Sequence, residues 1–188
     1  FARTMIQEFK DATHGGFFTV SHRHRDVPMR AKPYYDGAIA SGNSAAAFAL
    51  LRLSRFLGNE EYVETARETI ESNRSAMNAA PRGYLNMLIA LDVLHSASTE
   101  IAIVGNLADS HVQKLLTVVN CSYIPNKTIA LVNPHDREAL QMAERMPLLR
   151  DKQLVDGRAA AYVCENFTCR KPVSDAAALA ALLETPAL

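Results

Sequence analysis

The sequence has 188 residues, 48% of them hydrophobic, which is enough for one globular domain or two small ones. Twenty basic and twenty acidic residues give a net charge of zero, which argues against binding to nucleic acid or to an anionic membrane. No apolar run reaches the roughly 18 residues that span a bilayer, and no signal-peptide pattern opens the chain, so we expect a cytoplasmic protein. A helical pattern is already present at Phe1, which predicts that the chain is the back part of a longer protein.

Apolar residues recur at helical spacing through most of the first half of the chain. This periodicity predicts helices over residues 1–10, 44–57 and 59–70, and a further one that starts near Pro81. Asn59 is a favourable N-cap, and proline suits the first turn of a helix. Short loops join these segments, as in antiparallel helical hairpins.

A polar segment separates the first two helices. Residues 17–20 are aromatic and β-branched and predict a short strand or an extended arm. His22 and His24 have the spacing of a metal-binding pair, but no third ligand lies near them in sequence. We therefore expect a solvated loop and no metal site.

From residue 98 onward the pattern changes to short apolar runs that alternate with helical segments. We predict strands over residues 99–105, 128–132 and 159–164, each followed by a helix. Asp109 or Ser110 can cap the first of these helices. The fold class is therefore mixed α and α/β, with helical hairpins in residues 1–97 and a small three-stranded parallel βαβαβα unit in residues 98–188.

The candidate site is the loop that precedes the second helix. Asp36 can act as a general acid or base, and Tyr35, Ser41, Asn43 and Ser44 can form hydrogen bonds with a polyhydroxyl ligand. In this interpretation Asp36→Asn would weaken sugar binding and leave the melting temperature nearly unchanged. The alternative is that Asp36 forms a turn and that Ser41 or Asn43 caps the helix. A glycosidase also needs two carboxylates, and this loop offers one.

Two cysteines end the third predicted strand. Cys164 and Cys169 could form a disulfide, share a metal or meet a redox partner. Their spacing is neither C-x-x-C nor a complete zinc box, and Cys121 is remote, so we interpret them as a structural, reduced pair. Gly105 lacks the G-x-G-x-x-G spacing of a nucleotide site, and we expect no cofactor.

Five motifs follow one another in a recognisable order. They are Gly15–Phe18, Tyr35–Ala38 with Ser41–Ser44, Ile101–Gly105, Pro125–Lys127 and Ala161–Cys169. In this order they resemble the C-terminal part of thioredoxin-domain-containing proteins of the YyaL and spermatogenesis-associated protein 20 type. One departure is Ala40, which stands where that family usually has proline before Ser-Gly-Asn.

The resemblance implies a thioredoxin-like N-terminal domain followed by an (α/α) toroid similar to six-hairpin glycosidases and N-acylglucosamine 2-epimerases. Residues 1–97 would be the last hairpins of that toroid, and they would contribute Asp36 and Asn43 to a cavity for a carbohydrate-like small molecule. The parent would be a hydrolase or an epimerase, and this fragment alone would be inactive because its cavity is incomplete. The alternative is a noncatalytic module that couples the toroid to the thioredoxin-like domain or to a protein partner.

Overall fold

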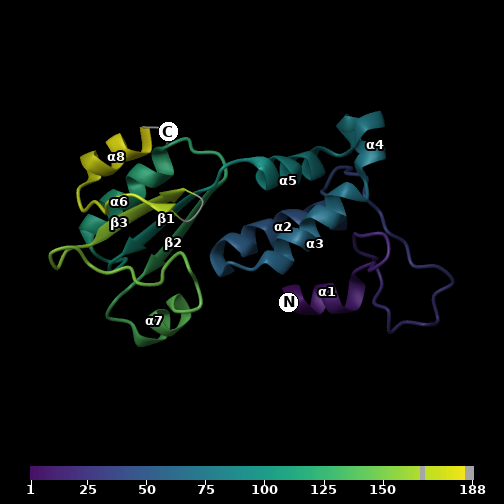
Figure 1. The fold of residues 1–188 in the computed structure, drawn as a ribbon, viewed down its shortest axis with the longest axis horizontal. Helices are drawn as coiled ribbons and strands as arrows, with labels where there is room; N and C mark the ends of the chain where they lie inside the picture. The colour runs from purple at the N-terminus through teal and green to yellow at the C-terminus, as the bar shows by residue number, and fades with distance from the viewer. Residues whose placement is uncertain (166–167, 185–188) are drawn as a thin grey trace. The chain divides into compact units, whose positions relative to one another are not determined.

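The computed structural model describes residues 1–165 and 168–184, which form a mixed α/β structure (Figure 1). The chain divides into two compact units. The first contains residues 1–54 and 59–96, and the second contains residues 55–58 and the chain from residue 97 onward. Within residues 1–165 and 168–184, no helix is both long and apolar enough to cross a membrane.

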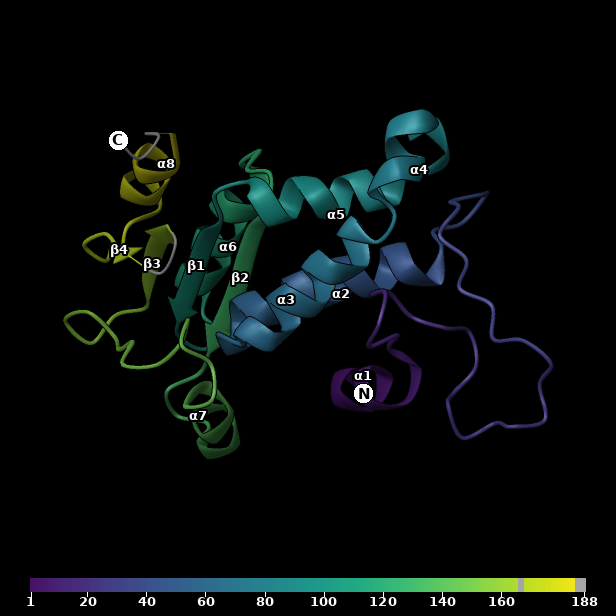
Figure 2. The ribbon, with the colours of Figure 1, turned by 45° about the vertical axis from the view of Figure 1, so that its right-hand side comes forward.

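The first unit is helical, as the periodicity predicts. Its elements are α1 (Ala2–Phe9), α2 (Gly42–Leu57, of which the last three residues belong to the second unit), α3 (Glu60–Glu71), α4 (Arg74–Ala79), the 3₁₀ turn η1 (Pro81–Gly83) and α5 (Leu85–His95). Figures 1 and 2 show α2 and α3 side by side. The core takes Leu50 from α2, Ile70 from α3 and Met87 from α5, all fully or almost fully buried. The Asn59 side chain caps α3 by accepting from the Tyr62 N–H, as predicted.

The segment around Pro81 differs from the single helix that the sequence predicts. One 3₁₀ turn separates α4 from α5, and the Tyr35 ring packs against Gly83 within that turn. A Cβ atom built on Gly83 would lie 2.6 Å from the ring, so the close approach requires glycine. The break leaves the first N–H groups of α5 available to a partner from another segment.

The predicted strand or arm over residues 17–20 contains no regular strand. Phe17 forms a single antiparallel bridge with Lys10. The arm continues irregularly, and the Thr19 N–H donates to the carbonyl of Ala31 at 2.9 Å. Its position therefore depends on separate contacts with the helices rather than on a sheet.

The second unit contains a mixed sheet with helices against it. Its elements are β1 (Thr99–Val104), α6 (Ser110–Cys121), β2 (Lys127–Val132), α7 (Arg137–Ala143), β3 (Ala160–Glu165), β4 (Thr168–Cys169) and α8 (Ala176–Glu184). The strand order is β2-β1-β3-β4, which includes β4 (labelled in Figure 2) in addition to the three predicted strands. Both faces of β1 are buried, as its apolar sequence predicts.

The prediction of an all-parallel sheet is wrong. β1 and β2 are parallel, but β3 runs antiparallel to β1, with Ala160 paired to Val104 at the end of β1. A parallel third strand would need a crossover that returns the chain to the end of the sheet where β1 and β2 begin. Here α7 has only seven residues, and no helix lies between Ala143 and Ala160. The chain consequently re-enters the sheet at the end where β1 finishes, so β3 runs in the opposite direction to β1.

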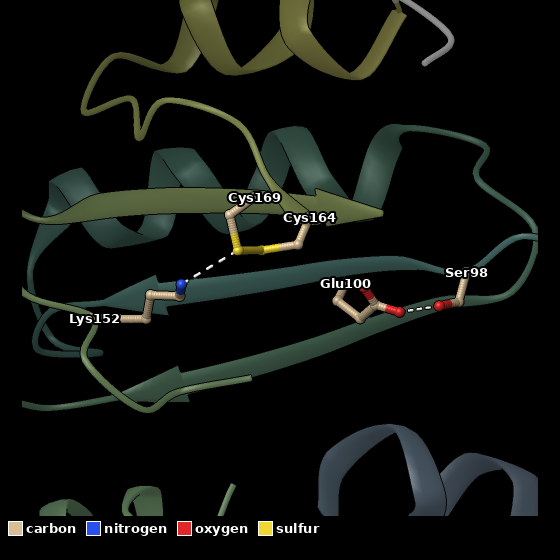
Figure 3. The surroundings of a disulfide bond; sticks show 5 residues. All are labelled: Ser98, Glu100, Lys152, Cys164 and Cys169. Carbon is tan, nitrogen blue, oxygen red and sulfur yellow. Dashed lines mark hydrogen bonds between the residues drawn. A yellow bond between two sulfur atoms is a disulfide. The ribbon is translucent and has the colours of Figure 1, made fainter. Parts of the chain in front are cut away.

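The strands alternate their side chains between two apolar clusters. Ile101, Ile103 and Val163 lie on the face that α6 and α8 cover. Ala102, Val104 and their neighbours lie on the other face, with Leu148 from the segment after α7. Glu100 and Cys164 are paired in register and lie on this second face (Figure 3).

Candidate functional site

Asp36 is the centre of the predicted loop, and the structure buries it to 7% exposure. Its Oδ1 accepts a hydrogen bond from the Ser41 N–H at 2.8 Å. Its Oδ2 accepts from the N–H groups of Asn86 at 2.8 Å and Met87 at 3.3 Å. The Asp36 N–H donates to the carbonyl of Gly83 at 2.8 Å. The carboxylate thus connects the start of α2 to the start of α5.

Asp36 acts as the N-cap that α5 lacks locally. Tyr84 precedes α5 and supplies no side-chain cap. Asn86 and Met87 are the second and third residues of the helix, whose N–H groups have no partner within it. A carboxylate at this position also interacts favourably with the positive end of the helix dipole.

The pKa of Asp36 reflects this environment. Burial alone would raise it, but hydrogen bonds from Ser41, Ser44, Asn86 and Met87 outweigh burial and hold the pKa below its ordinary value. Asp36 is therefore ionised at neutral pH. An ionised carboxylate with both oxygens in hydrogen bonds to the backbone is poorly suited to act as a general acid.

Ser41 and Ser44 form the cap of α2. The Ser44 N–H donates to Ser41 Oγ at 3.1 Å, and the two hydroxyl groups lie 2.8 Å apart. Both side chains are buried. The structure therefore shows the capping geometry that the sequence left as the alternative for this loop.

Asn43 attaches the irregular segment between α1 and α2, residues 10–41, to the start of α2. This whole segment is called the arm below. Its Oδ1 accepts from the Phe17 N–H at 2.6 Å, and its Nδ2 donates to the carbonyls of Phe17 at 3.0 Å and Pro33 at 2.9 Å. Asn43 is 1% exposed. Gly16, with φ of +76°, lies against the Asn43 amide and the Tyr34 hydroxyl, where a Cβ atom would collide. These contacts use the amide to hold two segments of the arm.

An ion pair closes the same arm. The Lys32 ammonium donates to Asp11 Oδ2 at 2.7 Å and to the Gly15 carbonyl at 2.8 Å. The hydrogen bond from Lys32, which outweighs burial, together with those from the N–H groups of Thr13 and His14, lowers the pKa of Asp11 to about 2. The contact is partly shielded, since the Asp11 side chain is 11% exposed.

We expect Asp11→Asn to lower the free energy of unfolding at neutral pH by roughly 1–2 kcal/mol, allowing for solvent screening. The folded pKa of about 2 lies below the ordinary value of 3.8, so the carboxylate's contribution is complete above about pH 4. It is lost as the pH falls towards 2. Urea unfolding at neutral pH and near pH 2 should therefore show the difference between wild type and variant shrinking on acidification. A constant difference would contradict the ion-pair explanation.

Tyr35 differs from the other predicted site residues of this loop because it is exposed, at 67%. Its ring packs edge-on against Tyr84 with the centroids 6.0 Å apart. The structure thus brings Asp36, Ser41 and Ser44 together inside the unit and leaves Tyr35 on its surface. Asn43 lies on the same helix start but faces the arm.

A second concave region lies in the α/β unit, where β1 and β2 end. The cleft has a volume of about 390 Å³. Its polar lining includes Asn106, Asp109, His111, His135 and Arg158. The carboxyl ends of parallel strands are a common location for ligands, and this lining suits a small polar molecule. The sequence does not group His111 with His135 or Arg158, because the lining comes from three separate segments within residues 105–159.

The cysteine prediction requires correction. Cys164 and Cys169 are joined in a disulfide, not present as a reduced pair. They lie opposite each other on β3 and β4, a pairing that the sequence did not predict. Asn166 and Phe167, which belong to the same sequence motif, lie outside the described residues. Cys121 is free and exposed.

In residues 1–165 and 168–184, which the structure describes, no three His, Cys, Asp or Glu side chains gather as metal binding would require. His22 and His24 lie in an exposed loop, close to Glu8 and Asp26 respectively. Glu8 also accepts from the Ser21 hydroxyl at 2.7 Å.

Comparison with known proteins places similar sequences in animals. The chain is 30% identical to human spermatogenesis-associated protein 20 over 181 residues, which is 96% of this chain and 23% of the human protein. The rat protein of the same name is 30% identical over 93% of this chain and 22% of its own length. An uncharacterized protein of Caenorhabditis elegans is 27% identical over 84% of this chain and 21% of its own length. No family model matches the sequence. The resemblance inferred from the motifs is confirmed, and the chain spans about a quarter of the length of these relatives.

Proposed function

This chain belongs to the family of spermatogenesis-associated protein 20, and on that premise we propose that its first unit is a noncatalytic packing module. The observation that carries the proposal is the burial of Asp36, Ser41, Asn43 and Ser44. Their hydrogen bonds go to one another or to the backbone of the first unit. The loop therefore holds together the starts of α2 and α5 and the arm through hydrogen bonds. It offers few polar groups to a ligand.

The loop and α5 together present an apolar surface on which another part of a longer protein packs. Four exposed apolar side chains lie on the loop and on the α5 segment that Asp36 joins to it: Tyr35, Ile39, Leu85 and Ile89. Leu85 and Ile89 are four residues apart and thus share one face of α5. In the (α/α) toroid implied by the resemblance, a further helical hairpin is the partner that fits such a face.

The test is a charge placed on this surface in the full-length protein. Ile89 is 52% exposed here, so Ile89→Glu on this chain by itself would change stability by about 0.5 kcal/mol or less. If another segment covers Ile89, the buried glutamate is expected to lower the melting temperature by more than about 5 °C. Met142→Glu on α7 is the matched control, because Met142 is 62% exposed and lies outside the proposed surface. Equal, small effects of the two variants would contradict the packing role.

A carbohydrate-binding role is a second candidate, and the exposed ring of Tyr35 is the observation that favours it. Flat aromatic faces provide apolar contact area together with a polar hydroxyl group. Titration calorimetry of the full-length protein with monosaccharides tests this candidate. Tyr35→Ala should abolish sugar binding without unfolding the protein, and Tyr123→Ala, at an exposed tyrosine in the other unit, should leave it intact. Absence of sugar binding in the wild type would exclude this role.

A further inference from the structure

We propose that the Cys164–Cys169 disulfide is a thiol–disulfide exchange site that oxidises a dithiol. The bond joins residues in register on the antiparallel strands β3 and β4 (Figure 3). The inference rests on the surroundings of the two sulfur atoms and is independent of the packing role proposed for the first unit. Three features support it: the unequal exposure of the two cysteines, a neighbouring cleft, and a lysine that donates a hydrogen bond to Cys169.

The two cysteines differ in access to solvent. Cys164 is 2% exposed, whereas Cys169 lies in an exposed strand. A cleft of about 260 Å³ adjoins the pair and is lined by Pro147, Leu148 and Lys152 as well as by both cysteines. Thiol–disulfide exchange needs an approach to one sulfur atom along the direction of the bond that breaks. Exposure and cleft together make Cys169 Sγ the sulfur that an incoming thiolate attacks.

Lys152 provides a positive charge at that sulfur. Its Nζ donates to Cys169 Sγ at 3.2 Å. The ammonium also lies 5.1 Å from the centre of the Tyr162 ring, and the Tyr162 hydroxyl donates to the carbonyl of Gln153 at 2.8 Å. Tyr162 thereby holds the segment that carries Lys152. A cation in this position attracts an incoming thiolate, and it stabilises the thiolate of Cys169 when Cys169 is the leaving group.

Glu100 is the buried acid on the same face of the sheet. It lies in register opposite Cys164, and its carboxylate is hydrogen-bonded to the Ser98 hydroxyl (Figure 3). Figure 3 shows the bond to Ser98 on the side away from the disulfide. We therefore assign the electrostatic role to Lys152 and no role in the exchange to Glu100.

The exchange balances as two displacements. One thiolate of the dithiol attacks Cys169 Sγ, a mixed disulfide forms, and the Cys164–Cys169 bond breaks with Cys164 leaving as a thiolate. The second thiolate of the dithiol then attacks its own partner sulfur in the mixed disulfide, and Cys169 leaves as a thiolate beside Lys152. The dithiol has lost two electrons and two protons and is now a disulfide. The cysteine pair has gained both electrons and, through solvent, both protons.

The first experiment measures reduction of the intact protein by dithiothreitol, with alkylation and mass spectrometry to count thiols. All proteins carry Cys121→Ser, because Cys121 is free and exposed and would react as well. We expect Lys152→Met to slow reduction roughly fivefold through loss of one nearby charge, and Lys152→Arg to retain most of the rate. Lys114→Met is the control, since Lys114 is an exposed lysine on α6, which packs on the other face of the sheet. Equal rates for all four proteins would overturn the assignment of Lys152.

A second experiment identifies the attacked sulfur. Oxidised glutathione is added to the separate variants Cys164→Ser and Cys169→Ser, each confirmed as folded by circular dichroism. We expect a mixed disulfide on Cys169 in the first variant and at least tenfold slower reaction of Cys164 in the second, because Cys164 is buried. Equal reaction of both, or reduction of the wild-type bond only at the rate of global unfolding, would show that the disulfide is structural and would refute the proposal.

Discussion

Asp36→Asn is expected to lower the free energy of unfolding by about 3 kcal/mol, or roughly 10 °C in melting temperature. Asparagine replaces one carboxylate oxygen with an NH₂ group. In one orientation of the amide this group would face the N–H of Ser41, and in the other it would face the N–H groups of Asn86 and Met87. Buried donors would then lack an acceptor, and α5 would lose the charge at its N-terminus. Thermal unfolding followed by circular dichroism measures the change.

Asp26→Asn is the matched control for this prediction. The Asp26 side chain is 84% exposed and lies 3.8 Å from His24 in the polar loop, so its substitution should change stability by about 0.5 kcal/mol or less. A different outcome would restore the catalytic interpretation of Asp36. If Asp36→Asn kept the melting temperature of the wild type and abolished binding of a sugar, the carboxylate would have to face a ligand.

Asn43→Asp should destabilise the protein by a similar amount, about 3 kcal/mol at neutral pH. The side chains have nearly the same shape, but the substitution puts a charged oxygen where Nδ2 now donates to the carbonyls of Phe17 and Pro33. The new carboxylate would be buried and repelled, so its pKa in the folded state would rise above that in the unfolded state. Acidification protonates it and restores a donor, and the deficit should therefore shrink as the pH falls from the raised folded-state pKa towards the unfolded-state value of about 4.

Urea unfolding at neutral pH and near pH 4 tests this pH dependence. Asn78→Asp is the control, because Asn78 is an exposed residue of α4. The control should remain close to wild type at both pH values. A deficit for Asn43→Asp that stayed constant or grew on acidification would mean that the amide is not the donor that holds the arm.

Local signals in the sequence were sufficient for much of the fold. Asn59 and Asp109 cap their helices as predicted, because each side chain bonds to an N–H only two or three residues away. The uninterrupted apolar run in β1 likewise predicts burial on both faces, which the structure shows. The residues that predict these features are neighbours along the chain, so periodicity and residue type are enough to identify them.

The candidate loop shows where local signals end. The sequence predicts its position before α2 and offers Ser41 or Asn43 as the cap, and the structure shows that Ser41 accepts from the Ser44 N–H. The bonds from Asp36 to Asn86 and Met87 span about 50 residues, and no local pattern records them. A carboxylate in a turn looks the same in sequence whether it faces a ligand or caps a distant helix.

The sheet and the cysteines were decided by tertiary structure for the same reason. Periodicity predicts a strand over residues 159–164 but contains no information on its direction, which depends on how the segment after α7 returns to the sheet. That direction sets β3 antiparallel to β1, and the β4 pairing that follows places Cys164 opposite Cys169. Helix caps follow from contacts between neighbours in the chain, and the burial of β1 is indicated by the apolar residues of the strand itself. Strand direction, the disulfide and the partners of Asp36 follow from contacts that form only when distant segments pack together.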